Sequence, residues 1–280
     1  MHRKPRTLSS ILIHAVLIVM AAINLTPIFW LTCAAFKRSD DSFAYAFLPW
    51  RHLERLTLDN FRQLFDMEPF GKWLINSIFL ASAYSVSVVT LSSLGGFALA
   101  KYRFRGKKSL MLLLLVTMLL PSQVLLGSLY ELMDRFGWIN SYLAILVPSA
   151  VSVFGTFLFR QAMLTVPDEL LQSGRLDGCG ELRLWWELAL PIVRPTVGAY
   201  TLMSFLASWS AFLWPQIVLQ DEGKYTLPIG LNNMIGLPGY QTQYGLLMAG
   251  TLLSILPVIV LFFAVQKDFI SGLTTGAVKG

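Results

Sequence analysis

Charged residues are scarce in this chain. Asp, Glu, Lys and Arg make up 14% of its 280 residues, whereas a soluble domain carries about a quarter. Hydrophobic residues reach 55%, and the mean hydropathy is +0.60. This surplus of apolar side chains excludes an ordinary soluble domain, because it requires lipid around much of the chain.

Groups that carry catalysis are also missing. The three histidines do not combine with cysteines or carboxylates at the spacing of a metal site. The sequence has no glycine-framed serine of a hydrolase and no glycine loop that ends in Gly-Lys-Ser or Gly-Lys-Thr. The run GCGELR at 178–183 begins like a dinucleotide-binding loop but lacks the third glycine and a preceding strand. We therefore expect no enzyme activity, no ATP hydrolysis, and no cofactor or metal bound by this chain.

The apolar residues gather into six runs, each about long enough to cross a bilayer as a helix. The runs cover residues 11–36, 74–100, 109–128, 141–159, 196–219 and 246–266. Backbone groups find no water in lipid, so each run should be helical, with kinks near Pro27, Pro121, Pro148 and Pro257. The sequence predicts an all-α membrane protein with six transmembrane helices in a single domain, residues 1–280.

Ionisable groups are nearly absent from these runs, His14 being the exception. Carriers driven by protons or sodium usually need such groups inside the membrane, so an ion-coupled carrier is disfavoured. A passive solute channel stays open, as does a membrane subunit whose energy comes from another protein.

Basic residues indicate the orientation. Three of them precede the first run, and KYRFRGKK at 101–108 has five and no acidic residue. Because Lys and Arg collect in cytoplasmic connections, we expect both termini in the cytoplasm and the loop at 37–72 outside. The net charge of +6 is thus a topology signal, and no clustered basic face of a nucleic-acid-binding domain is present. Cys33 and Cys179 would lie on opposite sides of the membrane, which excludes a disulfide between them.

The stretch QSGRLDGCGELRLWWELALP at 172–191 concentrates five charges in a chain that has few. Just before it, TVPD at 165–168 indicates the start of a helix at about 168–176, capped by Thr165, with Pro167 in its first turn. Gly178 and Gly180 permit positive φ, and Asp177 can cap a second helix.

The second helix has an apolar face formed by Leu182, Trp185, Trp186 and Ala189, and Pro191 ends it. Tryptophans suit the membrane–water boundary, so we interpret it as a helix that lies on the membrane. The first helix has no such stripe. Held away from the bilayer by a glycine elbow, it has the features of a segment that another protein binds.

The elbow resembles the EAA signature of permease subunits of bacterial ATP-binding-cassette importers: Glu-Ala-Ala, three residues, Gly, nine residues, then Ile-x-Leu-Pro. Here the run is Gln172-Ser173-Gly174, three residues, Gly178, nine residues, then a Leu-Ala-Leu-Pro at 188–191, and Asp177 precedes Gly178 as in the family. Gln172 replaces the glutamate, and Ser173 and Gly174 replace the alanines.

Other segments resemble the carbohydrate-uptake, maltose-type six-span members of that family. They are LTLDNFRQLF at 56–65, NSIFLA at 76–81, FALAKYRFRGKK at 97–108, WSAFLWPQ at 209–216 and GLTTGAVKG at 272–280. The resemblance implies a type I ABC importer permease in the inner membrane, with a cytoplasmic coupling loop at 161–195 and a cytoplasmic tail at 267–280.

The resemblance also implies partners. They are a second permease subunit in a heterodimer, two ATPase subunits that hold ATP and Mg, an external solute-binding protein and membrane lipid; nucleic acid is not among them. The helix at 168–176 would be the coupling helix in a cleft of one ATPase. The residues expected to couple to the ATPase are Glu169, Gln172, Ser173, Gly174, Asp177 and Gly178. The tail residues expected between the ATPase subunits are Thr275, Gly276, Lys279 and Gly280.

For several residues the sequence allows two interpretations. Gln172 offers only neutral hydrogen bonds where the family glutamate offers a charged one, and Asp177 is either an anionic contact or a helix cap. Serines at 82, 85, 92 and 93 either line a solute path or pack between helices, and packing is the commoner cause. The same choice holds for Tyr200, Trp209 and Trp214. The loop at 220–245 is either a connector or reaches the binding protein.

The solute is expected to be a sugar or oligosaccharide, with its binding residues unassigned. A glycerol-3-phosphate or glycerophosphodiester importer has the same sequence pattern and is the alternative within the family. An ion-coupled or passive carrier is the alternative outside it.

Overall fold

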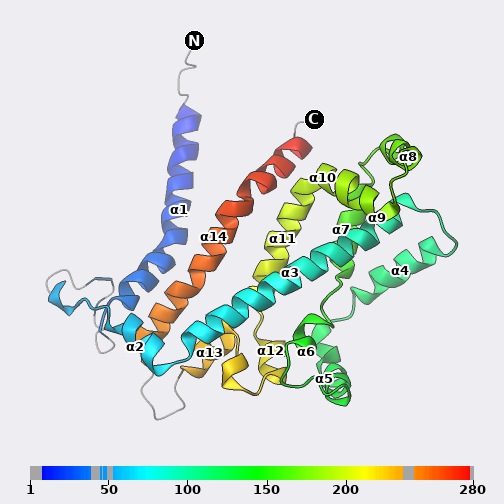
Figure 1. The fold of residues 1–280 in the computed structure, drawn as a ribbon. Helices are drawn as coiled ribbons and strands as arrows, with labels where there is room; N and C mark the ends of the chain where they lie inside the picture. The colour runs from blue at the N-terminus through cyan, green and yellow to red at the C-terminus, as the bar shows by residue number, and fades with distance from the viewer. Residues whose placement is uncertain (1–7, 39–44, 46, 49–52, 236–242, 278–280) are drawn as a thin grey trace. The chain divides into compact units, whose positions relative to one another are not determined.

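The computed structural model describes residues 8–38, 45, 47–48, 53–235 and 243–277, with side chains as far as Gln266. Every regular element in this part is helical, apart from an isolated bridge between Lys37 and Leu56. Figure 1 shows these helices, and their contacts divide the chain into two compact units. One comprises Met1–Phe70 and Leu231–Ile255, and the other comprises Gly71–Gly230 and Leu256–Gly280.

The first unit contains α1 (Leu8–Ala35), α2 (Asp59–Met67) and the beginning of α14 (Tyr244–Ala277). Asn60 of α2 is buried, and its Nδ2 donates to the carbonyls of Ala35 at 2.8 Å and Lys37 at 2.7 Å. These bonds satisfy carbonyls that the end of α1 would otherwise leave unpaired. Gly245 lies against the same amide, where a Cβ would come within 2.5 Å of Oδ1. Asn60 therefore holds α2 to the ends of both long helices.

The second unit is built around α3 (Phe70–Lys101), with α7 (Val153–Met163) and α11 (Arg194–Trp209) against it. A Cβ on Gly96 would come within 2.6 Å of Phe159 Cβ, so α3 and α7 approach closely at a glycine. Ser85 of α3 and Ser204 of α11 bond through their hydroxyls at 2.8 Å. Small residues and interhelical hydroxyl bonds of this kind are typical of helix packing in membranes.

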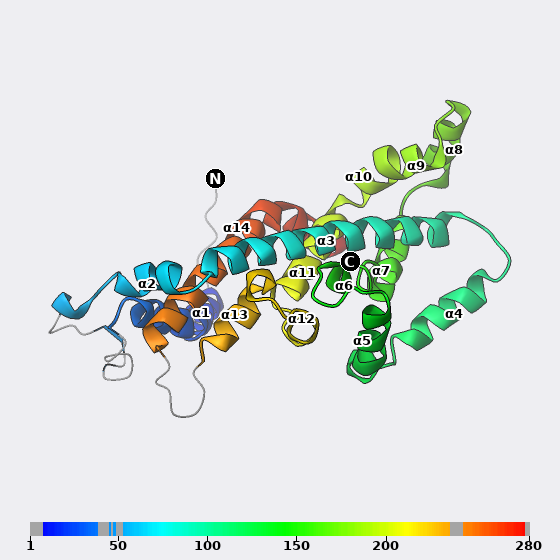
Figure 2. The same ribbon diagram turned by 60° about the horizontal axis from the view of Figure 1, so that its bottom comes forward.

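The second unit also contains α14 from Leu256 onward, and its remaining α-helices are short. They are α4 (Lys107–Thr117), α5 (Leu126–Arg135), α6 (Leu143–Leu146), α8 (Asp168–Leu176), α9 (Glu181–Arg183), α10 (Leu190–Ile192), α12 (Leu213–Val218) and most of α13 (Leu227–Asn233). Within this unit, α8 and α9 lie on one side of α3, and α5, α6 and α12 lie on the other (Figures 1 and 2).

Three of the predicted spans are single long apolar helices. Among the described residues these are Ser10–Ala35, Phe70–Lys101 and Tyr244–Gln266. Pro27 and Pro257 lie inside α1 and α14, which the structure assigns as continuous helices.

The other three predicted spans are interrupted, which corrects the expectation of one helix for each. α4 stops at Thr117, and a 3-10 turn at Ser122–Leu125 follows Pro121. Pro148 lies in the break between α6 and α7, and residues 210–212 separate α11 from α12. Pro121 and Pro148 have no backbone N–H to bond to the carbonyl four residues earlier, which is consistent with the first two breaks; Val147, just before Pro148, still has helical dihedrals.

The first part of the connection at 220–245 is fastened to the second unit. Asn140 has a φ of 60°, and its Oδ1 accepts from the backbone N–H groups of Gln220 and Asp221, both at 3.1 Å. Asn76 Nδ2 donates to the carbonyl of Tyr225 at 2.9 Å, and Ser77 Oγ accepts from Leu227 N at 2.7 Å. This half is thus ordered by α3, whereas residues 236–242 lie outside the described part.

Candidate functional site

α8 is seated on the second unit by one apolar face. Leu171 is buried, and Gly174 lies so close to the next helix that a Cβ would meet Leu184 Cδ2 at 2.5 Å. Leu171 and Leu184 belong to a cluster with Phe97 of α3 and Trp185. The opposite face is open, and Leu176 at its end is 89% exposed.

The elbow after α8 is closed by a Schellman motif. The N–H of Gly178 donates to the carbonyl of Arg175 at 3.0 Å, and the N–H of Cys179 donates to the carbonyl of Gly174 at 2.9 Å. The motif requires a left-handed residue at its centre, and Gly178 supplies it with a φ of 80°. The predicted positive φ of Gly178 is confirmed, whereas Gly180 has a φ of −70°.

An ion pair spans the elbow. Arg175 Nε donates to Glu181 Oε1 at 2.7 Å and Arg175 Nη2 to Oε2 at 3.1 Å, so the pair is bidentate. The Tyr102 hydroxyl donates to the same carboxylate. These bonds, that from Arg175 first, hold the pKa of Glu181 below its usual value. The start of α9 is thereby tied both to α8 and to the residue after α3.

A lysine fixes the other end of α8. Lys101 is the last residue of α3, and its side chain is 6% exposed. Its Nζ donates to the carbonyl of Val166 at 2.5 Å and to Asp168 Oδ1 at 2.7 Å. The bond from Lys101 lowers the pKa of the Asp168 carboxyl. A displacement of α8 would therefore be passed to α3 through Lys101 and through the Tyr102–Glu181 bond.

Both predicted caps are wrong. Thr165 donates its hydroxyl to the carbonyl of Ala162 at 2.8 Å, so it ends the preceding helix, and Pro167 occupies the N-cap of α8 without a side-chain bond. Asp177 is the C-cap of α8, and Gly180 stands at the N-cap of α9. Instead of an N-cap side chain, the ion pair between Lys101 and Asp168 holds the start of α8 in place.

The predicted apolar face of the second helix is also wrong in part. Residues 184–189 form a π-helix, so the buried positions do not follow the α-helical spacing. Leu184, Trp185 and Ala189 are buried, whereas Leu182 is 70% and Trp186 64% exposed. Helical structure continues past Pro191 to Ile192. Arg183 and Glu187 form the expected pair one turn apart, at 2.8 Å.

The predicted coupling residues fall into two groups. Gly174 lies on the buried face of α8 and packs against Leu184, whereas the other five are exposed along α8 and its elbow: Glu169, Gln172, Ser173, Asp177 and Gly178. In the tail, the α14 backbone stays helical through Thr275 and Gly276, and Lys279 and Gly280 lie outside the described residues.

Sequence reasoning missed Lys101, Tyr102 and Glu181. The first two belong to the run KYRFRGKK, which indicates topology by its charge alone. For Glu181 the sequence does contain a signal of the ion pair, since Arg175 and Glu181 have opposite charges and lie on either side of Gly178 and Gly180.

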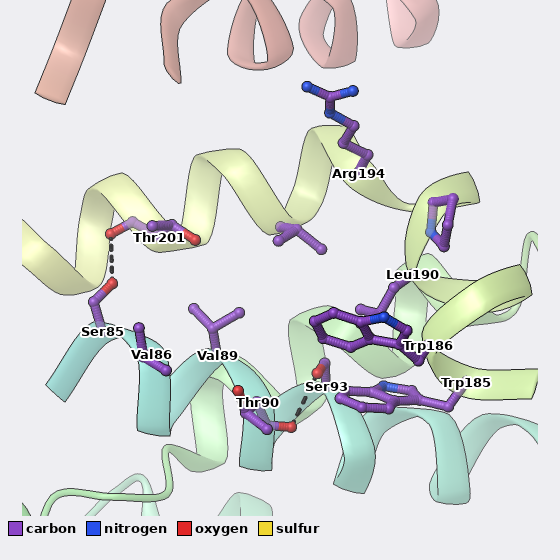
Figure 3. A pocket seen from close by; sticks show the side chains of 12 residues that line it. Ser85, Val86, Val89, Thr90, Ser93, Trp185, Trp186, Leu190, Arg194 and Thr201 are labelled. Atoms are coloured by element: carbon purple, nitrogen blue, oxygen red, sulfur yellow. Dashed lines mark hydrogen bonds between the residues drawn. The ribbon is translucent and has the colours of Figure 1, made fainter. Parts of the chain in front are cut away.

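Three of the four serines on α3 are packed between helices, namely Ser85, Ser92 and Ser93, whereas Ser82 is exposed. A cavity of about 590 Å³ between α3, α11 and the tryptophan pair is lined in part by Ser85 and Ser93. Figure 3 shows the side chains that line it. The hydroxyls of Ser85 and Ser93 already donate, at 3.0 Å each, to the carbonyls of Thr201 and Thr90. The cavity walls are otherwise largely apolar, and Arg194 points away from the tryptophans (Figure 3).

The three aromatic residues with two interpretations also pack. Tyr200 is buried and meets Phe159 edge to face, and Trp209 is buried and stacks on Phe205. Trp214 Nε1 donates to the carbonyl of Ala144 at 2.9 Å. These contacts favour the packing interpretation for all three.

The chain has relatives over its whole length. It is 34% identical over 281 residues to the arabinooligosaccharides transport system permease protein AraQ of Halalkalibacterium halodurans, with 100% of each chain covered. It is 34% identical to the maltodextrin transport system permease protein MdxG of Bacillus subtilis, with 80% of this chain and 81% of that protein covered. It is also 33% identical to the sn-glycerol-3-phosphate transport system permease protein UgpE of Yersinia pestis, with 73% of each covered.

The fold has a close match among solved structures. The crystal structure of a bacterial ABC transporter involved in the import of the acidic polysaccharide alginate has a TM-score of 0.82 at 20% identity, covering 96% of this chain and 99% of that chain. The predicted all-α permease fold is thus confirmed. Residues 92–269 match the model of the family described as binding-protein-dependent transport system inner membrane component. The chain belongs to this family of transporter membrane components.

Proposed function

We propose that this chain is the transmembrane permease subunit of an ATP-driven, binding-protein-dependent importer of a sugar or oligosaccharide, and that it forms half of the translocation pore. The observation that carries the proposal is the match to the arabinooligosaccharide permease over the full length of both chains. The maltodextrin permease supports the same solute class.

The exposed face of α8 is the proposed contact with a separate ATPase. The helix is short, is held at both ends by ion pairs, and presents Glu169, Gln172 and Ser173 to solvent. Its attachments to Lys101 and Tyr102 lead into α3, which packs against α7 and α11. A movement imposed on α8 would therefore reach the helices of the second unit as a rigid displacement.

Asp177 is the anionic group proposed to face the ATPase. It is exposed at the C-cap of α8 and does not cap α9. Gln172 contributes neutral hydrogen bonds beside it, about half as strong as charged ones. The tail residues Thr275, Gly276, Lys279 and Gly280 are proposed to lie against the ATPase subunits. The assembly also contains a second permease and an external binding protein, with both termini of this chain in the cytoplasm.

Uptake in a strain that lacks this chain tests the solute class. Labelled arabino-oligosaccharides and maltodextrins should enter cells that carry the chain with its binding protein and ATPase, and should not enter the deletion strain. The match to the glycerol-3-phosphate permease UgpE makes that solute the second candidate. Uptake of sn-glycerol-3-phosphate without sugar uptake would reject the sugar proposal and leave the permease role intact.

A further inference from the structure

A basic cavity lies beside the connection between α3 and α4. Its volume is about 560 Å³, and all four ionisable side chains that line it are basic: Arg103, Lys107, Lys108 and Arg160. The first three come from the connection and the start of α4, and Arg160 comes from α7. The cavity thus gathers positive charge from elements that are far apart in sequence.

Two features of this cavity favour an anion. Lys107 and Lys108 begin α4, whose first turn has no acidic residue, although a helix start favours negative charge. The Nε of Arg160 is buried and has no hydrogen-bond partner in the part of the chain that the structure describes. An anion in the cavity would relieve both conflicts.

Two carboxylates near the connection between α3 and α4, those of Asp168 and Glu181, are engaged elsewhere. Asp168, whose charge acts on Arg103, is held by Lys101 at 2.7 Å. Glu181 is held by Arg175 and Tyr102. Lys107 Nζ donates to the carbonyl of Tyr102 at 3.0 Å, which keeps the lysine at the cavity. Neither acid therefore takes the place of an external anion.

An apolar surface lies beside the basic cavity on α4. No side chain of α4 is buried, and Leu112 and Leu113 are 64% and 61% exposed. Met111 lines the basic cavity itself. A ligand with an anionic head and an apolar body matches the basic cavity together with the exposed apolar side chains of α4.

We propose that the cavity binds one anionic glycerophospholipid of the surrounding membrane, with its phosphate at Arg160, Lys107 and Lys108 and an acyl chain along α4. Basic pockets between membrane helices bind lipid head groups of this kind. Arg103 of this cavity is two residues after Lys101 in the chain. A bound lipid would therefore restrain the lysine that anchors α8. The proposal is independent of the transported solute.

Native mass spectrometry of the purified chain, with whatever partners purify with it, tests this site. The probes are phosphatidylglycerol, phosphatidylcholine of the same acyl chains, and inorganic phosphate. One phosphatidylglycerol should be retained per chain, and the variant K107Q/K108Q should bind it roughly 25-fold more weakly, since each basic residue contributes about fivefold. Arg160→Gln should weaken binding by about fivefold.

Arg105→Gln is the matched control, because Arg105 lies in the same connection and does not line the cavity. It should leave the affinity unchanged. If R105Q weakens binding as much as R160Q, the attraction is general surface charge and the site is rejected. Equal retention of phosphatidylcholine also rejects it, as does displacement of the lipid by millimolar inorganic phosphate. If R160Q does not fold, K107Q/K108Q still tests the site, since Lys108 is exposed and Lys107 is only partly buried.

Discussion

Gly178 adopts a φ of 80°, and a Cβ added there would meet nothing within 4 Å. Gly178→Ala therefore tests backbone conformation alone, at an expected cost of about 1–2 kcal/mol to the elbow. We expect faster amide exchange over residues 177–181 and weaker solute-stimulated ATP hydrolysis by the assembled transporter.

Gly180→Ala is the control for this change. Gly180 has a φ of −70° and equal free space, so alanine should be tolerated there. Asparagine at 178 should cost less than alanine, because asparagine visits the left-handed region more readily. Equal behaviour of G178A and G180A would show that the elbow does not depend on the left-handed residue.

Gly174 is a second position at which the structure requires a glycine, in this case because of close packing. The family signature has alanine here, yet a methyl group would lie 2.5 Å from Leu184 Cδ2. We expect Gly174→Ala to destabilise the chain by about 1–3 kcal/mol through overpacking, measured as a lower midpoint of thermal unfolding in detergent. Leu184→Val in the same chain should recover part of the loss. If the two changes are simply additive, the contact is not the cause.

At the scale of elements, the Arg175–Glu181 pair joins α8 to α9. The pKa of Glu181 is lowered from 4.5 by Arg175 and Tyr102. The carboxylate therefore stabilises the fold above pH 4.5, and this contribution is lost as the pH falls through the lower, folded pKa. We expect exchange protection of residues 177–181 to be constant above this range and to fall below it. In Glu181→Gln the fall should disappear; if it persists, another group causes it.

The sequence predicts a secondary-structure element well where residues close together in the chain determine its limits. The limits of α8 and the conformation of Gly178 follow from Pro167 and from the glycine elbow. The breaks within three of the six apolar runs could not be predicted. An apolar run has the same composition whether its helix continues or stops, as α4 does at Thr117. The anchors Lys101 and Tyr102 depend on pairing across 67 and 79 residues, which no local pattern specifies.

At the scale of the whole molecule, the orientation can be measured in the second unit by itself. Gly223 and Arg105 are both exposed and belong to this unit. In a chain with Cys179 replaced by serine, Gly223→Cys should react with a membrane-impermeant maleimide added outside intact cells, and Arg105→Cys should react only after lysis. The buried Cys33 should remain unlabelled. Labelling of R105C from outside intact cells would contradict the proposed topology.

The central claim is that α8 docks on a separate ATPase, and site-specific photo-crosslinking tests it most directly. Leu176 is 89% exposed at the end of α8. Leu132 is 44% exposed and belongs to α5, a helix on the other side of α3 from α8 (Figures 1 and 2). With a benzophenone amino acid at each position in turn, the account predicts an ATPase adduct from position 176 in membranes of the assembled transporter and none from position 132. An adduct from position 132 without one from position 176 would contradict it.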